Sequence, residues 1–224
     1  MLPGWTRSHV VAHLIGNTLA QTRQVDYALR GELVEVYTGG QEARAADIEE
    51  RAVLAPSDLV AQLRDAHASW EAAVVRLDAS SMAAPVEYRS GTVADVVAGR
   101  WMECLVHAVD LGVPAYTCRD WPFDFCDVLL GYLLVRLPAD QRVRLEATDA
   151  PYDQTLDVAA RNYADPGVGA HSAREMPDLR SFVHLRGRIS DIAGFLSDRG
   201  PAEALESLAD PLGELNPYPR GSIR

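Results

Sequence analysis

The chain has 224 residues, and its 21 basic residues against 32 acidic ones give a formal net charge of −11. That length suits one large domain or two small ones, with enough chain for a real hydrophobic core. The acidic balance argues against nucleic acid or a membrane surface as partner, because both favour a basic face. Hydrophobic residues make up 48% and charged residues 24%, which is the composition of a globular protein.

The cysteines and the apolar runs indicate where the protein works. Cys104, Cys118 and Cys126 cannot all pair and show no CxxC spacing, so no disulfide framework is indicated. A reducing, cytoplasmic setting fits best. The start of the chain lacks the pattern of a signal peptide, and the longest apolar run, residues 128–135, is far too short to span a bilayer.

The first expected helix begins after Thr6, a residue suited to be its N-cap, and runs to about Glu35. Gly39 and Gly40 break the pattern, and a polar stretch without clear periodicity follows up to Pro56.

Three further helices are predicted before residue 138. Ser57 can cap the first of them, in which apolar residues recur at spacings of three, four and seven. Thr92 opens the next one, which ends before Gly112 and Pro114. The third, over about residues 123–137, is apolar on most sides, so we expect it to be buried.

The pattern changes after Pro138. Val143, Leu145 and Ala147 alternate with charged residues, as the residues of a half-buried strand do. Further strands are predicted over 155–159 and 181–186, followed by a helix over 189–197 and, from residue 210, a loosely ordered tail. The sequence therefore predicts an α+β protein with a helical domain over residues 1–137 and a small α+β domain over residues 138–224.

Ionisable residues within apolar helix faces are the candidates for chemistry. Glu103 and His107 are four residues apart on one predicted helix, so both point the same way. His13 lies among apolar residues of the first helix. Two helices of a bundle can therefore supply two imidazoles and one carboxylate. Borderline divalent metals accept that set and keep a fourth position open for catalysis.

Other interpretations of these residues are open. Glu103 and His107 can form a simple helix ion pair, and His9, four residues before His13, offers a rival pair of imidazoles. Cys104 can be a thiolate ligand or a small core residue. Asp110 can orient His107 from a second layer around the metal, or merely end the helix.

Two segments resemble a known family. GWTRSHVVAHL at residues 4–14 is similar to the start of the second helix of mycothiol-dependent maleylpyruvate isomerases, which are DinB-like metalloenzymes. RWMECLVHAVDLG at residues 100–112 is similar to their metal-binding helix. The resemblance implies that His13, Glu103 and His107 are the zinc ligands and the catalytic centre. It also implies a DinB-like helical bundle followed by a small sterol-carrier-like α+β domain.

The sequence departs from the family pattern in two places. The family has a helix before the Gly-Trp-Thr motif, which here stands almost at the start. Either the true start lies upstream, or the bundle lacks its first helix and covers the gap by forming an oligomer such as a homodimer. Gly194 stands where the resemblance implies an arginine that holds the substrate. Arg188 and Arg199 are nearby candidates to replace that arginine.

The resemblance implies the reaction. Zinc would activate mycothiol, the small thiol of actinobacteria, and its thiolate would add to the cis double bond of maleylpyruvate. Rotation and expulsion of the thiol would then give the trans isomer. Because the substrate is a small dianion, we expect arginine forks at its ends, with Arg7 and Arg100 as candidates beside those named above.

Two other functions are weighed against isomerisation. The same activated thiol could form a stable thioether or open an electrophilic ring, which would make the protein a mycothiol S-transferase of detoxification or biosynthesis. A metal-free protein that binds a small ligand ranks last, because all three candidate zinc ligands are present.

Overall fold

The computed structural model describes residues 2–138, 141–157, 182–208 and 210–217. By their contacts the residues form two compact units, Met1–Val113 and Pro114–Ser222. Within the described ranges, no helix is long and apolar enough to cross a membrane.

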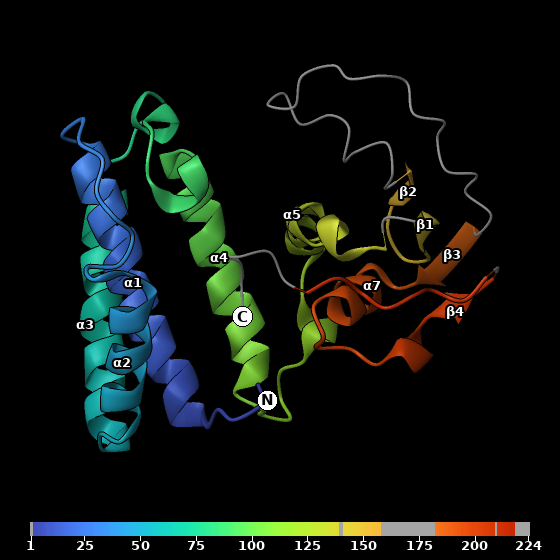
Figure 1. The fold of residues 1–224 in the computed structure, drawn as a ribbon, viewed down its shortest axis with the longest axis horizontal. Coiled ribbons are helices and arrows are strands. Elements are labelled where there is room, and N and C mark those ends of the chain that lie inside the picture. The colour runs from blue at the N-terminus through green and yellow to red at the C-terminus, as the bar shows by residue number, and fades with distance from the viewer. Residues whose placement is uncertain (1, 139–140, 158–181, 209, 218–224) are drawn as a thin grey trace. The chain divides into compact units, whose positions relative to one another are not determined.

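The first unit is a bundle of four helices around α1. α1 contacts each of the other three helices (Figure 1), and residues 75–92, which include two short 3-10 helices, connect α3 to α4. The helices are α1 (Arg7–Ala28), α2 (Gly40–Ala52), α3 (Pro56–Val74) and α4 (Val93–Asp110).

The predicted N-caps of α1 and α4 are confirmed. Thr6 and His9 form a reciprocal capping box at the start of α1. The backbone N–H of Thr92 donates to Asp95 Oδ2 at 2.7 Å at the start of α4. These local bonds satisfy amide groups that a helix start would otherwise leave without a partner, and so fix where each helix begins.

Three expected boundaries were wrong. α1 ends at Ala28 rather than near Glu35, because the chain turns back through Gly31, whose φ is +72°. The polar stretch before Pro56 is the helix α2, in which only Ile48 is buried, so it carries no apolar stripe. α3 is capped at Ala55 and begins at Pro56, whose fixed φ suits the first helical position.

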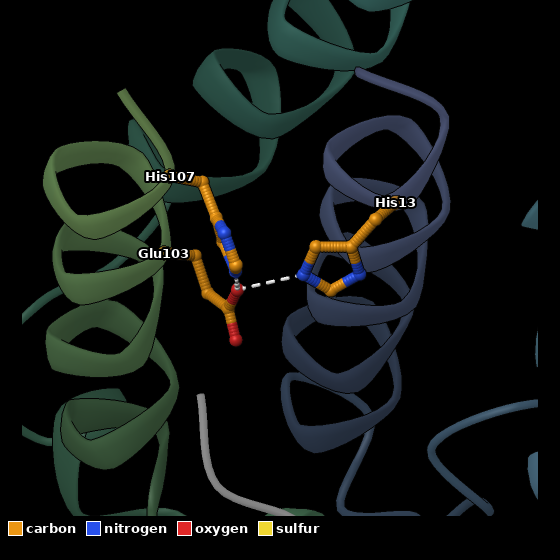
Figure 2. A group of neighbouring side chains, drawn as sticks. All are labelled: His13, Glu103 and His107. Atoms are coloured by element: carbon orange, nitrogen blue, oxygen red, sulfur yellow. Dashed lines mark hydrogen bonds and ion pairs between the residues drawn. The ribbon is translucent and has the colours of Figure 1, made fainter. Parts of the chain in front are cut away.

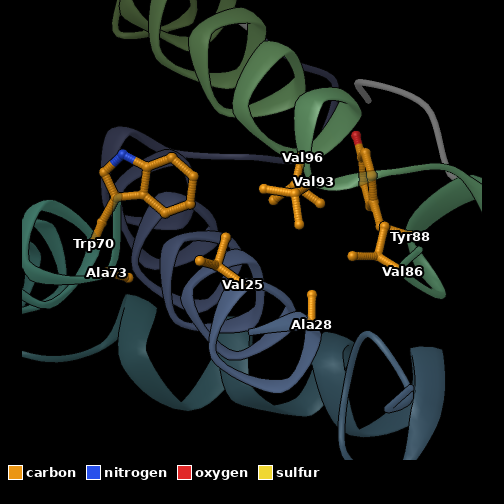
Figure 3. Close-up of a cluster of buried hydrophobic side chains, with 8 residues drawn as sticks. All are labelled: Val25, Ala28, Trp70, Ala73, Val86, Tyr88, Val93 and Val96. Carbon is orange, nitrogen blue, oxygen red and sulfur yellow. The ribbon is translucent and has the colours of Figure 1, made fainter. Parts of the chain in front are cut away.

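Two apolar clusters hold the bundle together. One joins α1 to α2 and α3 through residues that include Ile15, Ile48 and Leu59. The other joins α1, α3 and α4 around Val25 and Trp70, as Figure 3 shows. The second cluster fixes α1 against α4, and this pair of helices carries the candidate site.

The second unit is a four-stranded sheet with helices. The strand order is β2-β1-β3-β4, with β1 and β3 parallel and both outer pairs antiparallel. Inward residues of the central strands alternate with more exposed ones, as predicted. The elements are α5 (Phe123–Leu133), β1 (Arg142–Ala147), β2 (Asp153–Asp157), β3 (Phe182–Gly187), α7 (Ile189–Leu196) and β4 (Glu206–Ser207).

The grouping by contacts differs from the expected domain division. α5 packs on α7, and it therefore belongs to the second unit, whereas the sequence suggested a boundary after it. The extent of independently folding domains stays a prediction. In all, the described residues form six α-helices and one small mixed sheet, so the expected α+β fold of a helical bundle with a small α+β part is confirmed.

Candidate metal centre

Three buried side chains meet between α1 and α4. Figure 2 shows His13 on one helix facing Glu103 and His107 on the other. Glu103 Oε2 lies 2.9 Å from His13 Nε2 and 3.1 Å from His107 Nε2. Their ligand atoms all lie within 4.8 Å of one another, and no other set of His, Cys and acidic residues in the described ranges is so arranged.

Asp110 fixes the orientation of His107. The Nδ1 of His107 lies 2.7 Å from Asp110 Oδ2, and the carboxylate can only accept, so Nδ1 carries the proton. His107 Nε2 is thereby left with its lone pair toward Glu103, and this buried atom has no hydrogen-bond partner in the described part of the chain. A histidine that ligates a metal is oriented in this way.

The charges of His13 and Glu103 suit a cation, whereas His107 must be in its neutral form to bind one. Burial lowers the pKa of His13, which keeps its imidazole neutral. Burial alone would raise the pKa of Glu103, but the two imidazoles lower it well below its ordinary value, so the carboxylate is ionised. Burial lowers the pKa of His107, whereas Asp110 and Glu103 raise it, and the result lies above the ordinary value.

This donor set fits zinc. Two imidazole nitrogens and a carboxylate oxygen are a common set of protein ligands for a catalytic zinc ion, with one position left for water or substrate. His107 Nε2 has no hydrogen-bond partner among the described residues and lies 3.1 Å from a buried carboxylate oxygen of Glu103. A cation bound to these two atoms would satisfy both.

The structure brings only some of the other predicted residues to this centre. His9 lies on the same helix, but its Nδ1 bonds to Thr6 and its Nε2 faces Glu49 at 3.4 Å. Cys104 lies outside the cluster, and burial raises the pKa of its thiol, which disfavours a thiolate ligand. Arg7 donates to the carbonyl oxygens of Leu111 and Gly112, and so satisfies the end of α4.

Arg100 lies one helical turn before Glu103 and is buried. Its Nε and Nη1 have no hydrogen-bond partner in the described residues. A buried guanidinium group without a partner is costly.

Arg188 and Arg199 lie in the second unit. Arg188 Nε pairs with Asp149 at 3.0 Å, and Arg199 donates to a backbone carbonyl. Any role of these two arginines in substrate binding stays a prediction.

Gly194 on α7 is held by close packing. A Cβ atom at this position would lie 2.6 Å from Cys118 Sγ, so no larger residue fits without a shift. The arginine implied at this position by family resemblance would not fit here.

Gly194→Ala should therefore destabilise the protein by about 1–3 kcal/mol, the usual cost of overpacking a buried site. Thermal unfolding of the metal-free protein measures the effect. Gly131→Ala on α5 is the control, because a Cβ there meets nothing within 4 Å and should be neutral or mildly stabilising. Equal melting temperatures for the two variants would contradict the packing argument.

The sequence analysis missed Arg44 on α2. Its Nη2 lies 3.1 Å from His13 Nδ1, on the side of the ring away from Glu103. α2 has no apolar periodicity, so nothing in the sequence pattern placed this arginine near the histidine.

Comparisons with known proteins agree with this fold. Residues 1–112, half of the chain, match the family described as mycothiol maleylpyruvate isomerase N-terminal domain. Two crystal structures of mycothiol-dependent maleylpyruvate isomerase, one of a histidine-to-alanine mutant, have the same fold with a TM-score of 0.71. Each alignment covers 92% of this chain and 79% of the other at 21% identity. No curated protein matches the sequence significantly.

Proposed function

Because the chain belongs to the mycothiol maleylpyruvate isomerase N-terminal domain family, we propose that it is a zinc-dependent, thiol-using cis–trans isomerase of the maleylpyruvate type. The observation that carries the proposal is the buried meeting of His13, Glu103 and His107, with a lone pair of His107 left unpartnered. Mycothiol is the proposed cosubstrate. A homodimer and a cytoplasmic location stay predictions.

The residues of the proposed metal centre have different roles. His13, Glu103 and His107 would hold the metal, and Asp110 keeps His107 in the tautomer that can bind it. A zinc ion bound by two neutral imidazoles and one carboxylate keeps a net positive charge, which lowers the pKa of a thiol. His13 and His107 are buried, so water has little access to this side of the centre.

Arg100 would position the substrate. Its buried guanidinium group has unpartnered donors at Nε and Nη1, so it can donate charge-assisted hydrogen bonds to a carboxylate. It lies one turn from Glu103 on α4, so a carboxylate held there would bring the attached carbon chain close to the three-residue cluster. The substrate class that fits is a small unsaturated acid.

The proposed reaction needs no oxidant or reductant beyond the thiol and the substrate. A thiolate sulfur adds to one carbon of the conjugated cis double bond, and the displaced electron pair moves onto the neighbouring carbonyl oxygen. The former double bond can then rotate. When the electron pair returns, the carbon–sulfur bond breaks, the thiolate leaves and the trans isomer remains.

The first test is the zinc content of purified wild-type protein and of His107→Ala. We expect about one zinc per chain in the wild type and little in the variant, because the variant loses one ligand of three. Wild-type protein that stays metal-free after incubation with zinc would contradict the proposal. Phe125→Leu, in the core of the second unit, is the control, because it changes a buried residue without removing a candidate ligand and should keep its zinc.

The second test separates isomerisation from thiol transfer. The zinc-loaded protein is incubated with thiol and maleylpyruvate, and proton NMR follows the alkene signals. Release of the trans isomer with the thiol unconsumed is the expected result. Consumption of one thiol per substrate, with loss of the alkene signals, would instead assign the chain to the S-transferases.

A further inference from the structure

A polar cavity lies between α1 and α2 and reaches the candidate metal ligand His13, which is one of its lining residues. This cavity of about 280 Å³ is lined by residues of α1, of α2 and of the segment that joins them. Three arginines, Arg23, Arg44 and Arg51, line it against a single acidic residue, Asp47. The chain as a whole has a net charge of −11, whereas the residues that line this cavity carry a net positive charge.

Two of the three arginines have no counter-ion. Arg51 Nε lies 2.9 Å from Asp47 Oδ1, so their charges cancel. Arg23 donates to Thr38 Oγ1 at 2.8 Å, and Arg44 lies over the ring of Tyr37. Across the described ranges, neither Arg23 nor Arg44 has a carboxylate within ion-pair distance, so the cavity keeps two uncompensated positive charges.

A buried side-chain oxygen of a residue that lines this cavity also lacks a hydrogen-bond partner. Asn17 lines the cavity, its side chain is buried, and its Oδ1 has no hydrogen-bond partner in the part of the chain that the structure describes. Buried side-chain amides are normally satisfied. The cavity therefore combines two arginines that have no counter-ion with a nearby buried oxygen that has no hydrogen-bond donor. Its volume suits a small molecule.

We propose that this cavity binds a small dianion, a dicarboxylate or a phosphate, through Arg23 and Arg44. Guanidinium groups match the oxygens of both chemical classes. The site is distinct from Arg100, which lies on α4.

Arg44 connects this cavity to His13. Arginine has only donors, so the contact at 3.1 Å requires His13 Nδ1 to accept and places the ring proton on Nε2, facing Glu103. A metal bound at Nε2 requires the proton on Nδ1 instead, where it would oppose Arg44. An anion that draws Arg44 into the cavity therefore frees His13 to bind metal, a link that rests on the proposed function.

Calorimetric titration of the metal-free protein, without thiol, tests the anion site alone. The probes are succinate and inorganic phosphate. We expect saturable binding of at least one, weakened at least tenfold in Arg44→Gln and in Arg23→Gln, because each loses a charge-assisted hydrogen bond. Arg30→Gln is the control, since Arg30 is exposed on the turn after α1 and pairs with Glu32.

The two probes identify the ligand class. Binding of succinate alone indicates a dicarboxylate, and binding of phosphate alone indicates a phosphate group. Absence of binding by either probe overturns the proposal, as does equal affinity in wild type and both cavity variants. Because no metal is present, these outcomes do not depend on whether the chain is a zinc enzyme.

The second measurement is zinc affinity, by competition with a chromophoric chelator, with and without the anion that binds. We expect the anion to raise zinc affinity about tenfold in the wild type, within the usual range of coupling between sites. Arg44→Ala should bind zinc more tightly than wild type, with no effect of the anion. Zinc binding that ignores the anion in the wild type overturns the link, whereas absence of zinc binding contradicts the proposed function instead.

Discussion

Glu103→Gln should lower zinc affinity by about 10²–10³-fold and leave the metal-free protein nearly as stable as the wild type. A four-ligand zinc site contributes about 10–16 kcal/mol, so one charged ligand accounts for roughly a quarter of that. The metal-free fold tolerates the change because the amide keeps the size of the side chain, and its oxygen can accept from His13 Nε2 as Glu103 Oε2 does.

Chelator competition measures the zinc affinity, and thermal unfolding in the presence of a strong chelator measures the stability. Glu103→Ala is the matched control, because it also loses the metal ligand but leaves a cavity and removes the buried acceptor of His13 Nε2. We expect it to unfold at a lower temperature than Glu103→Gln. A glutamine variant that binds zinc within threefold of wild type would show that Glu103 is not a ligand.

The central part of the site could be predicted because it depends on local spacing. Glu103 and His107 are four apart on one helix, and the structure places both toward α1 (Figure 2). His13 lies among apolar residues, and such a position on a helix is buried in the bundle. Asp110, three residues after His107, follows from the same helical period.

The other contacts of the site depend on tertiary structure. Arg44 reaches His13 across 31 positions of sequence from a helix with a single buried residue, so no apolar stripe indicates which face it presents. Arg7 was expected to hold substrate, but its partners are carbonyl oxygens at the end of α4, 104 and 105 positions away. Backbone carbonyls are the same in every sequence, so a residue pattern cannot reveal such a contact.

The fold shows the same division between local and distant information. Three features depend only on residues close in sequence, and all three were predicted correctly. They are the helix caps at Thr6 and Thr92 and the alternation in β1. The two-residue strand β4 was missed, because it owes its conformation to pairing with β3 rather than to its own residues.

Arg100→Met should make the protein more stable and at the same time much less active. The buried guanidinium group has two N–H groups without partners, and each unsatisfied buried donor costs about 1–3 kcal/mol. Methionine has a similar length and no such cost, so we expect the melting temperature to rise by several degrees, at about 2–4 °C per kcal/mol for a chain of this size.

Activity should change in the opposite direction. If Arg100 donates two charge-assisted hydrogen bonds to a substrate carboxylate, kcat/KM should fall by about 10²-fold or more, mainly through KM. Arg100→Lys keeps the charge but loses the planar fork, so it should recover only part of the activity. Arg64→Met, at an exposed position of α3, controls for the loss of a surface charge. A less stable methionine variant with unchanged KM would mean that Arg100 supports the bundle, and that the substrate carboxylate is held elsewhere.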